Sequence, residues 1–416
     1  MEALLVSYGI DWANLLVRWL HLITGIAWIG ASFYFVWLDN SIRPPKPGSD
    51  LEKKGVSGEL WAVHGGGFYN PQKYLVAPAE LPEELHWFKW EAYATWITGV
   101  AMLFIVYYFN ASAMMVDKSV ANLTGPEAVG VGIGTLVLGW IVYDLLCKSP
   151  LGKREGVLGL VMFVFIVAVV YLLTHLLSGR AAYIHVGAMI GTIMVGNVLM
   201  VIIPGQRKLV EAMKAGRSPD PIHGRKGKQR SVHNNYFTLP ILFIMISNHY
   251  AMTYTHAHSW LVLAAIMAAG VLIRHFFNLR HKGKVSVGYP IAGVALLLAV
   301  AVAIAPRPVA PAASTAPAAS AGEGAAPVAA AAPDFARIQA IVTQRCASCH
   351  SDKPTQAGFA TAPAGMMLQT PELIHQHAAK VFQRAVQTKD MPLANMTQMT
   401  DAERAELAAW FQAGAK

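Results

Sequence analysis

Residues 156–177 read GVLGLVMFVFIVAVVYLLTHLL, a stretch without one Asp, Glu, Lys or Arg. A helix of about 20 mostly apolar residues is long enough to cross the hydrocarbon core of a bilayer. Seven further apolar runs occur, so the sequence predicts an all-α, polytopic membrane protein with eight transmembrane helices. The eight runs are Trp12–Leu38, Ala92–Phe109, Val129–Leu146, Gly156–Leu177, Ala182–Ile203, Phe237–Thr255, Trp260–Leu279 and Val287–Ala305.

The composition of the whole chain agrees with embedding in a lipid bilayer. Of its 416 residues, 55% are hydrophobic and only 14% are charged, against about 25% charged in an ordinary soluble domain. This excludes a conventional cytosolic enzyme. The net charge of +9 raises the question of a nucleic-acid partner. Most of that charge lies in the apolar part, residues 1–305, where membrane topology explains it without any nucleic acid.

The positive charges also indicate how the chain is oriented in the membrane. Cytoplasmic loops of membrane proteins are rich in Lys and Arg. The loops after the first, third, fifth and seventh expected helices hold 20 Lys and Arg, whereas the other three hold only Lys118 and Arg180. We therefore expect both termini to face the non-cytoplasmic side.

The sequence after the last apolar run divides into two parts. Residues 306–333 consist almost wholly of Ala, Pro, Ser and Val, which cannot build a core, so they are expected to form a flexible linker. Residues 334–416 return to globular composition and are expected to form a small helical domain. Thr400 and Glu403 have the spacing of a capping box, so a last helix should begin there. Its buried stripe should consist of Leu407, Trp410 and Phe411.

The small domain carries the strongest chemical signal in the chain. Cys346-Ala347-Ser348-Cys349-His350 has the C-x-x-C-H spacing of covalent c-type haem attachment. Two thiols at this spacing reach the two vinyl groups of one porphyrin, and the histidine ligates the iron. A disulfide or half of a zinc site are the alternatives, although no second Cys pair lies nearby.

A haem that transfers electrons usually has a sixth ligand, and His/Met ligation gives it a higher potential than two histidines. Met391, which precedes Pro392 and the last expected helix, is our choice for this ligand. The helix–haem motif–loop–Met–helix order resembles the class I cytochromes c. The other possible ligands in this domain are Met366, Met367, Met396, Met399, His375 and His377.

Four histidines lie in the outer halves of four different expected spans. Ionisable groups at this depth are costly and often functional, and paired histidines from different helices can ligate a b-type haem. We therefore expect a possible haem b, with hydrogen-bonded core histidines as the alternative. The four residues are His21, His175, His185 and His249.

A second set of polar residues lies near the inner ends of the spans. Guanidinium, amide and aromatic groups together suit a flat, anionic heterocycle that forms hydrogen bonds. Basic side chains that reach toward the interface are the alternative. The candidate catalytic and binding residues are Glu91, His233, Asn235, Arg274 and His275, with Gln206, Arg207, Asn234 and Asn278 nearby.

Two resemblances to known families add to this interpretation. Residues 18–30, RWLHLITGIAWIG, resemble the opening helix of membrane protoporphyrinogen oxidases, in which the histidine that matches His21 is a haem ligand. The whole layout resembles the bacterial membrane-bound urate hydroxylases, or urate oxidases. That second resemblance rests on the eight runs, the fused cytochrome, NPQKY at 70–74, HNNY at 233–236 and SNHY at 247–250.

The second resemblance implies an activity and a location. Urate would be oxidised to 5-hydroxyisourate with water as the oxygen source, in a bacterial inner membrane with the cytochrome in the periplasm. Electrons would pass through the c-type haem to a terminal cytochrome oxidase. One alternative is a membrane-anchored electron-transfer subunit of a respiratory complex, and another is a transporter with a redox sensor.

Overall fold

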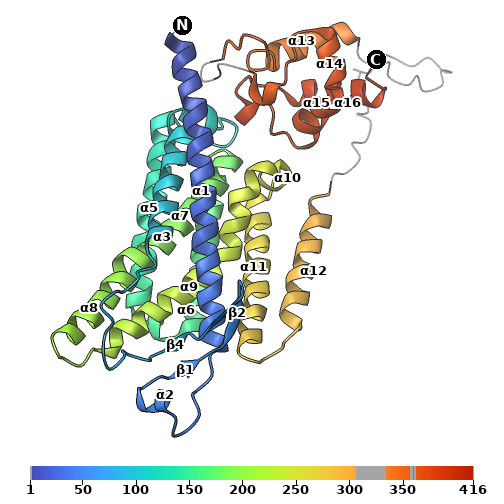
Figure 1. Cartoon of the computed structure of the whole chain (residues 1–416). Coiled ribbons are helices and arrows are strands. Elements are labelled where there is room, and N and C mark those ends of the chain that lie inside the picture. The colour runs from blue at the N-terminus through green and yellow to red at the C-terminus, as the bar shows by residue number, and fades with distance from the viewer. Residues whose placement is uncertain (1, 306–333, 357–358, 360–361, 416) are drawn as a thin grey trace.

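The structure is a computed structural model that describes residues 2–305, 334–356, 359 and 362–415. Long helices run side by side, and a small C-terminal domain lies at one end of them (Figure 1). The expected linker, residues 306–333, lies outside the described residues. The long helices are α1 (Glu2–Ser41), α3 (Trp90–Met102), α5 (Gly125–Lys148), α6 (Glu155–Thr174), α7 (Gly179–Gly196), α8 (Ile203–Lys214), α9 (Pro221–Ile246), α11 (Ser259–His281) and α12 (Gly288–Ala303).

Two of these helices continue through a π-helical turn. The turn η1 (Leu103–Tyr108) extends α3, and η3 (Asn197–Ile202) joins α7 to α8. Counted with these turns, six of the described helices are long and apolar enough to cross a membrane by length and composition. They are Tyr8–Ser41, Trp90–Tyr108, Gly125–Lys148, Glu155–Thr174, Gly179–Lys214 and Ser259–His281.

The sixth and eighth expected spans, 237–255 and 287–305, are not among these six helices. Helix α9 begins well before the apolar run, because Pro221 occupies its first turn and the Asp220 side chain accepts the Ile222 N–H. It ends at Ile246, where the 3-10 turn η4 (Ser247–His249) and α10 (Ala251–Tyr254) follow. Helix α12 has 16 residues. The expected bounds were therefore wrong for the sixth span.

The loop between α1 and α3 contains short strands, so the all-α expectation is wrong there. Strand β1 (Gly58–Glu59) pairs with β4 (Gln72–Lys73), and β2 (Ala62–His64) pairs with β3 (Gly67–Tyr69), both antiparallel. Gly65 and Gly66 make the turn of the second hairpin with φ of +58° and +81°. Glycine adopts this left-handed backbone without a steric penalty, which permits a two-residue turn.

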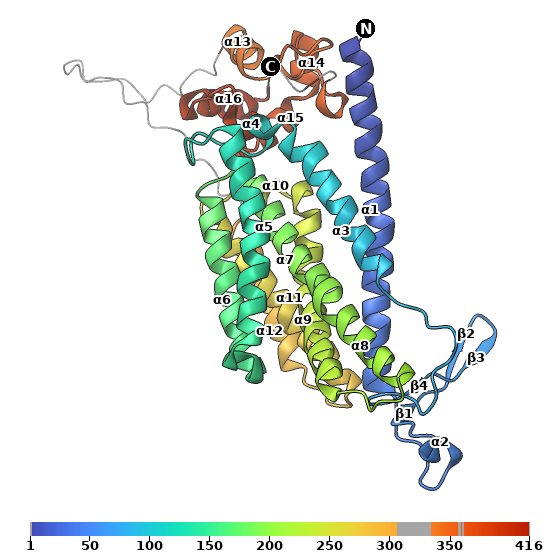
Figure 2. The same ribbon diagram turned by 90° about the vertical axis from the view of Figure 1, so that its left-hand side faces the viewer.

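Helix α7 is the most buried of the six candidate spans, whereas α1 lies at the edge of the bundle beside α3 (Figure 2). Close approach of α5 and α7 depends on small residues: a Cβ on Gly196 would lie 2.5 Å from the ring of Trp140. The N-terminus, α4 (Ala111–Met114) and α10 lie at the end of the bundle that faces the C-terminal domain (Figure 1). Helix α2 (Asp50–Lys53) and the strands lie at the opposite end.

The C-terminal domain packs helices around one small apolar core. They are α13 (Phe335–Arg345), α14 (Pro371–Gln376), α15 (Ala378–Val381), the π-helical η6 (Phe382–Gln387), the 3-10 turn η7 (Leu393–Asn395) and α16 (Asp401–Gln412). The expected capping box of Thr400 and Glu403 is confirmed. Leu407 and Trp410 are buried in the core as expected, and Phe411 is half-buried against Phe382.

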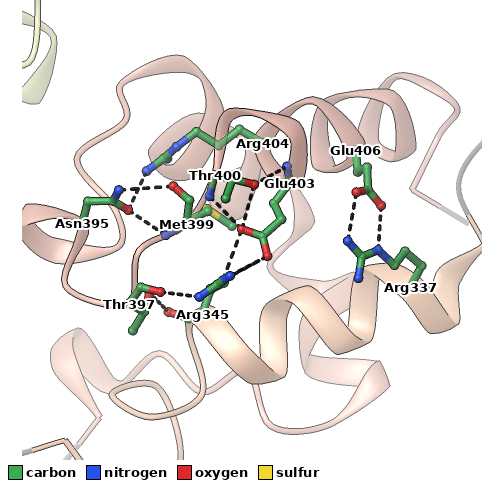
Figure 3. A network of polar contacts seen from close by, with 9 residues as sticks. All are labelled: Arg337, Arg345, Asn395, Thr397, Met399, Thr400, Glu403, Arg404 and Glu406. Atoms are coloured by element: carbon green, nitrogen blue, oxygen red, sulfur yellow. Dashed lines mark hydrogen bonds and ion pairs between the residues drawn. The ribbon is translucent and has the colours of Figure 1, made fainter. Parts of the chain in front are cut away.

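Glu403 links the start of α16 to α13 (Figure 3). Its carboxylate accepts hydrogen bonds from the backbone N–H of Thr400 at 2.7 Å and from Arg345 Nη2 at 2.9 Å, and Glu403 is only 6% exposed. Burial alone would raise the pKa of Glu403, but the hydrogen bonds from Thr400 and Arg345 outweigh it and hold the pKa below its usual value. The charged carboxylate therefore contributes to the stability of this domain.

We expect Glu403→Gln to destabilise the C-terminal domain by about 3 kcal/mol, because it leaves the Arg345 guanidinium without its partner charge. Amide hydrogen exchange of α16 in the full chain should accelerate accordingly. The contribution of Glu403 is complete above the ordinary pKa of 4.5 and disappears as the pH falls through the lowered pKa. Arg337–Glu406 joins the same two helices on the surface, so Glu406→Gln should have a much smaller effect.

Candidate functional site

The C-x-x-C-H motif forms one compact turn at the end of α13. The backbone N–H groups of Cys349 and His350 both bond to the carbonyl of Cys346, at 3.2 and 2.9 Å. This turn places the two half-buried thiols and the imidazole next to one another, and the thiols are not joined in a disulfide. His350 Nδ1 lies 2.9 Å from the carbonyl of Met366. A carbonyl only accepts, so Nδ1 carries the hydrogen and Nε2 is left for a metal.

These features fit a c-type haem. The two thiols can form the thioether bonds, and the orientation of His350 by a backbone carbonyl is the arrangement expected of an axial ligand. Met391 is half-buried on the loop between η6 and η7. The rival Met399 is 3% exposed and belongs to the apolar core, where its sulfur packs against other side chains. Met391 therefore stays our prediction for the sixth ligand.

Arg404 holds the loop that carries Met391. This guanidinium is 6% exposed, donates to the carbonyl of Met391 at 2.8 Å and to Asn395 Oδ1 at 3.2 Å, and also contacts the carbonyl of Ala385. Three segments of the domain are tied together by this one side chain from α16, and Figure 3 shows its contact with Asn395. This role of Arg404 could not be predicted from the sequence, because Arg404 lies on a polar helix with many charged neighbours.

We expect Arg404→Met to release the Met391 loop while Cys346 and Cys349 keep their covalent haem. Loss of a thioether ligand lowers the haem potential. The fall should be on the order of 100 mV, since axial ligands set haem potentials over about 0.8 V. A redox titration of the purified chain measures it. Arg337→Met, on the exposed face of α13, is the control, and an equal fall in that variant would contradict the assignment.

The four outer histidines occupy different environments. His21 on α1 is half-buried, and its Nδ1 lies 3.0 Å from both the carbonyl of Thr95 and the hydroxyl of Thr98 on α3. His175, at the end of α6, and His249, in η4, are exposed. Among the described residues, no group of three or more His, Cys, Asp or Glu side chains could hold a metal ion. The structure thus gives the four histidines no common cluster.

His185 on α7 is fully buried, with Nδ1 bonded to the carbonyl of Ala181 at 2.8 Å. Its Nε2 has no hydrogen-bond partner among the described residues. A Cβ on Gly132 of α5 would lie 2.6 Å from this Nε2, so the ring packs directly against the glycine backbone. The ring of Tyr108 stacks on the His185 ring, at 5.7 Å between ring centroids. His185 therefore has little space for a planar cofactor.

A cavity of about 280 Å³ lies toward the end of the bundle opposite the C-terminal domain. It is bounded by α1, the segment before α3, the α7–η3–α8 helix and α9. Indole and phenyl rings form much of its wall, with amide, hydroxyl and carboxylate groups between them. The lining residues are Trp28, Ile29, Ala31, Ser32, Phe35, His86, Trp87, Phe88, Glu91, Met194, Val198, Ile202, Gln206, Ser231, Asn234 and Thr238.

Three of the inner candidates, Glu91, Gln206 and Asn234, line this cavity, and two others lie elsewhere. His233 turns to α5 and α6, where Nδ1 lies 2.8 Å from the Tyr143 hydroxyl and Nε2 lies 3.3 Å from Glu155. His275 Nδ1 lies 2.7 Å from the Tyr236 hydroxyl. A second hollow of about 320 Å³ at the α8–α9 turn contains none of the predicted residues.

Arg274 and Asn235 lie next to the cavity without lining it. Arg274 is 5% exposed, donates from Nε to Asn235 Oδ1, and places its guanidinium 4.1 Å from the ring centroid of Phe33. Phe33 lies on the turn of α1 that contributes Ser32 and Phe35 to the cavity wall. Arg274 Nη2 has no hydrogen-bond partner among the described residues. A buried cation with a free donor is an arrangement that suits an anion.

The sequence analysis missed two features of this site. The aromatic residues Trp28 and Phe35 gave only the signal of an apolar span. Arg230 was counted as a charge of a cytoplasmic loop, yet it is 4% exposed inside α9 and forms an ion pair with Asp144 at 2.7 Å. Basic residues that precede an apolar run look the same in sequence whether they face water or the bundle.

Comparison with known families decides what kind of domain surrounds this cavity. A family model described as urate oxidase N-terminal matches residues 7–305. The chain belongs to this urate oxidase family. A cytochrome c family model matches residues 335–414. No curated protein and no solved structure gave a significant match to the chain.

This urate oxidase family member thus carries a C-terminal cytochrome c domain, as the resemblance predicted. The cytochrome c domain implies haem c, and the motif at Cys346–His350 lies inside the matched range. The family match on the membrane domain covers the whole bundle, including every residue that lines the inner cavity. The family match therefore suggests urate as the ligand of that cavity.

Proposed function

We propose that the chain oxidises urate to 5-hydroxyisourate and passes the electrons to its own cytochrome c domain. One observation carries the proposal: a urate oxidase domain and a cytochrome c domain occupy a single chain, at residues 7–305 and 335–414. Contact between α4 and η7, the turn that follows Met391, supports a direct exchange between the two domains. Haem c, when bound, supplies a one-electron acceptor.

The reaction balances without molecular oxygen. Water supplies the oxygen that bonds to C5 of urate, and two protons and two electrons leave. The inner cavity suits this chemistry, because its aromatic rings can stack on a planar bicyclic substrate. We propose that Glu91 accepts one of the protons, since it is the carboxylate in the cavity wall. Arg274, with its free Nη2, would balance the negative charge of the urate anion.

The distance between the two sites supports a second haem. The cavity and the cytochrome c domain lie toward opposite ends of the helices (Figure 1), and the hydrocarbon core is about 30 Å thick. We propose that His21 ligates a b-type haem between them. Its Nδ1 is held by Thr95 and Thr98 of α3, which leaves Nε2 for iron. His175 and His249 remain the candidates for the second ligand, whereas the packing around His185 leaves little space for a haem.

We expect His21→Ala to lose b-type haem while keeping c-type haem. Pyridine haemochrome analysis of the purified chain distinguishes the two haems by their absorption bands. His64→Ala is the control for the ligand role of His21, because His64 is exposed on strand β2, outside the helices. A wild-type chain with c-type haem alone would remove the second haem from the proposal.

The topology and the electron acceptor belong to the same proposal. We infer a bacterial inner membrane with both termini in the periplasm, because the loops at the end opposite the cytochrome domain hold most of the Lys and Arg. A terminal cytochrome oxidase would then accept electrons from the cytochrome c domain. The full set of eight spans, which adds α9 and the shorter apolar helix α12 to the six candidates, is part of this proposal.

The test is urate-dependent reduction of the c-type haem band in isolated membranes. The band should appear on addition of urate without added partner proteins, and 5-hydroxyisourate should form in a ratio of one per two electrons. An electron-transfer subunit that relays electrons between partner complexes would show no reduction with urate alone. That result would overturn the proposed function.

A further inference from the structure

We propose that Asn234 recognises the substrate through its side-chain amide and that Arg230, acting through Asn197, fixes the direction in which this amide faces. The inference rests on the proposed function, because it assigns the cavity to urate. Asn234 lies on α9 and lines the cavity. Arg230 lies one turn earlier on α9, and Asn197 is the first residue of the π-helical turn η3.

The three side chains form a buried chain of hydrogen bonds. Arg230, Asn197 and Asn234 are 4%, 0% and 6% exposed. Arg230 Nη1 donates to Asn197 Oδ1 at 3.2 Å, and Asn197 Nδ2 donates to Asn234 Oδ1 at 2.8 Å. Asn234 Nδ2 donates to the backbone carbonyl of Met194 at 3.0 Å. Asp144 holds the other side of the Arg230 guanidinium at 2.7 Å.

The two ends of this chain determine every orientation between them. An amide can be turned either way, but a guanidinium only donates and a backbone carbonyl only accepts. Asn197 must therefore present its oxygen to Arg230 and its nitrogen to Asn234. Asn234 must present its oxygen to Asn197 and its nitrogen to Met194. If either amide were reversed, two donors or two acceptors would face each other. Each buried group left without a hydrogen bond would cost about 1–3 kcal/mol.

A branch of the network leads away from the cavity. Asn197 Nδ2 also donates to the hydroxyl of Tyr143 at 2.9 Å, so this hydroxyl gives its own hydrogen to His233 Nδ1 at 2.8 Å. His233 Nε2 then donates to Glu155 at 3.3 Å. A carboxamide does not readily pass protons, so Asn197 separates this branch from the cavity. We therefore assign the network a positioning role and not a proton-conducting one.

The fixed orientation leaves Asn234 one amide hydrogen on Nδ2 and one lone pair on Oδ1. Side by side, these two groups complement a lactam edge, in which a ring N–H lies next to a ring carbonyl. Urate consists largely of such edges, whereas a planar heterocycle without a ring N–H beside a carbonyl cannot form both bonds. Asn234 is thus the residue by which the cavity would select an oxopurine over other flat rings.

The test uses Asn197→Asp in the full chain. Aspartate has the shape of asparagine and still accepts from Arg230, but it cannot donate to Asn234 Oδ1, so the Asn234 amide loses its fixed direction. Urate binding is measured with the haem kept reduced by dithionite, so that bound urate is not consumed. We expect binding to weaken by about 10- to 100-fold, since one or two hydrogen bonds to substrate are lost. In turnover, KM should rise much more than kcat falls.

Asn14→Asp is the matched control. Asn14 Oδ1 also accepts from an arginine, Arg18 Nη2 at 3.0 Å, but it lies at the other end of α1 from the cavity. This variant should bind urate like the wild type. Unchanged urate binding by a folded Asn197→Asp chain would overturn the inference. If the wild-type chain neither binds nor oxidises urate, the proposed function fails instead.

A second measurement decides the question even if Asn197→Asp does not fold. The wild-type chain should bind at least one of the ring-N-methylated urates far more weakly than urate. The methyl group replaces the ring N–H that would donate to Asn234 Oδ1. In Asn234→Ala the ratio of the two affinities should fall toward one. A ratio that stays at its wild-type value in Asn234→Ala would overturn the inference.

Discussion

A chain in which Cys346 and Cys349 are both replaced by serine should lose urate oxidation in membranes altogether, to below about one thousandth of the wild-type rate. Covalent attachment requires both thiols, and a serine hydroxyl forms no thioether bond. The cytochrome c domain would then hold no electron acceptor, and two electrons cannot leave urate without one. The rate should be measured with oxygen present, because the proposed function allows no direct transfer to oxygen.

Cys147→Ser is the control for this experiment. It removes the only other cysteine, which is 9% exposed inside the membrane domain, and it should leave the haem-stained band on a denaturing gel unchanged. Urate binding by the double-serine chain separates two explanations for lost activity. A chain that binds urate but does not oxidise it has lost its acceptor, whereas full-speed oxidation with oxygen alone would refute the proposed electron path.

Arg274→Met should lower kcat/KM for urate by about 100-fold or more while the c-type haem spectrum stays unchanged. Methionine keeps the apolar contact with Phe33 but removes the charge. A buried charge–charge hydrogen bond contributes roughly 2–5 kcal/mol to binding when one partner is truncated, which corresponds to a factor of about 30 to several thousand. Steady-state kinetics in detergent with an artificial electron acceptor for the haem would measure it.

Arg280→Met on the last turn of the same helix is the matched control, because Arg280 is exposed and its removal changes the charge of α11 equally. The control should keep its activity within a factor of about two. Equal losses in the two variants would mean that the charge of the helix end matters and not the position of Arg274. Retained activity in Arg274→Met would mean that Arg274 does not bind the urate anion.

The features that could be predicted from the sequence are those formed by residues close together in the chain. Cys346, Cys349 and His350 lie within five residues, and the Thr400–Glu403 capping box lies within four. Both were found because neighbouring residues decide their geometry. The apolar runs were found for the same reason, except for the bounds of α9, since the polar helical segment that precedes its apolar run carries no hydropathy signal.

For the inner cavity, the kinds of polar side chain could be predicted from the sequence, but not which of them line the cavity. Asn234 and Asn235 are neighbours in sequence, yet on a helix their side chains point about 100° apart. Asn234 meets Asn197 and the cavity, whereas Asn235 meets Arg274 and Asn278 of α11. Which of the two faces the cavity depends on how α9 packs between α7 and α11. That packing is set by contacts between residues far apart in the sequence.

The π-helical turn η3 determines which face of α8 meets the cavity. A π-helical turn contains about one more residue than an α-helical turn, so it absorbs that residue without turning the helix that follows. If Asn197–Ile202 became regular α-helix with no residue removed, α8 would rotate by about 100° relative to α7. Gln206 would then leave the cavity wall while Asn197 stayed in place. Deleting one residue together with this change would restore the original orientation of α8.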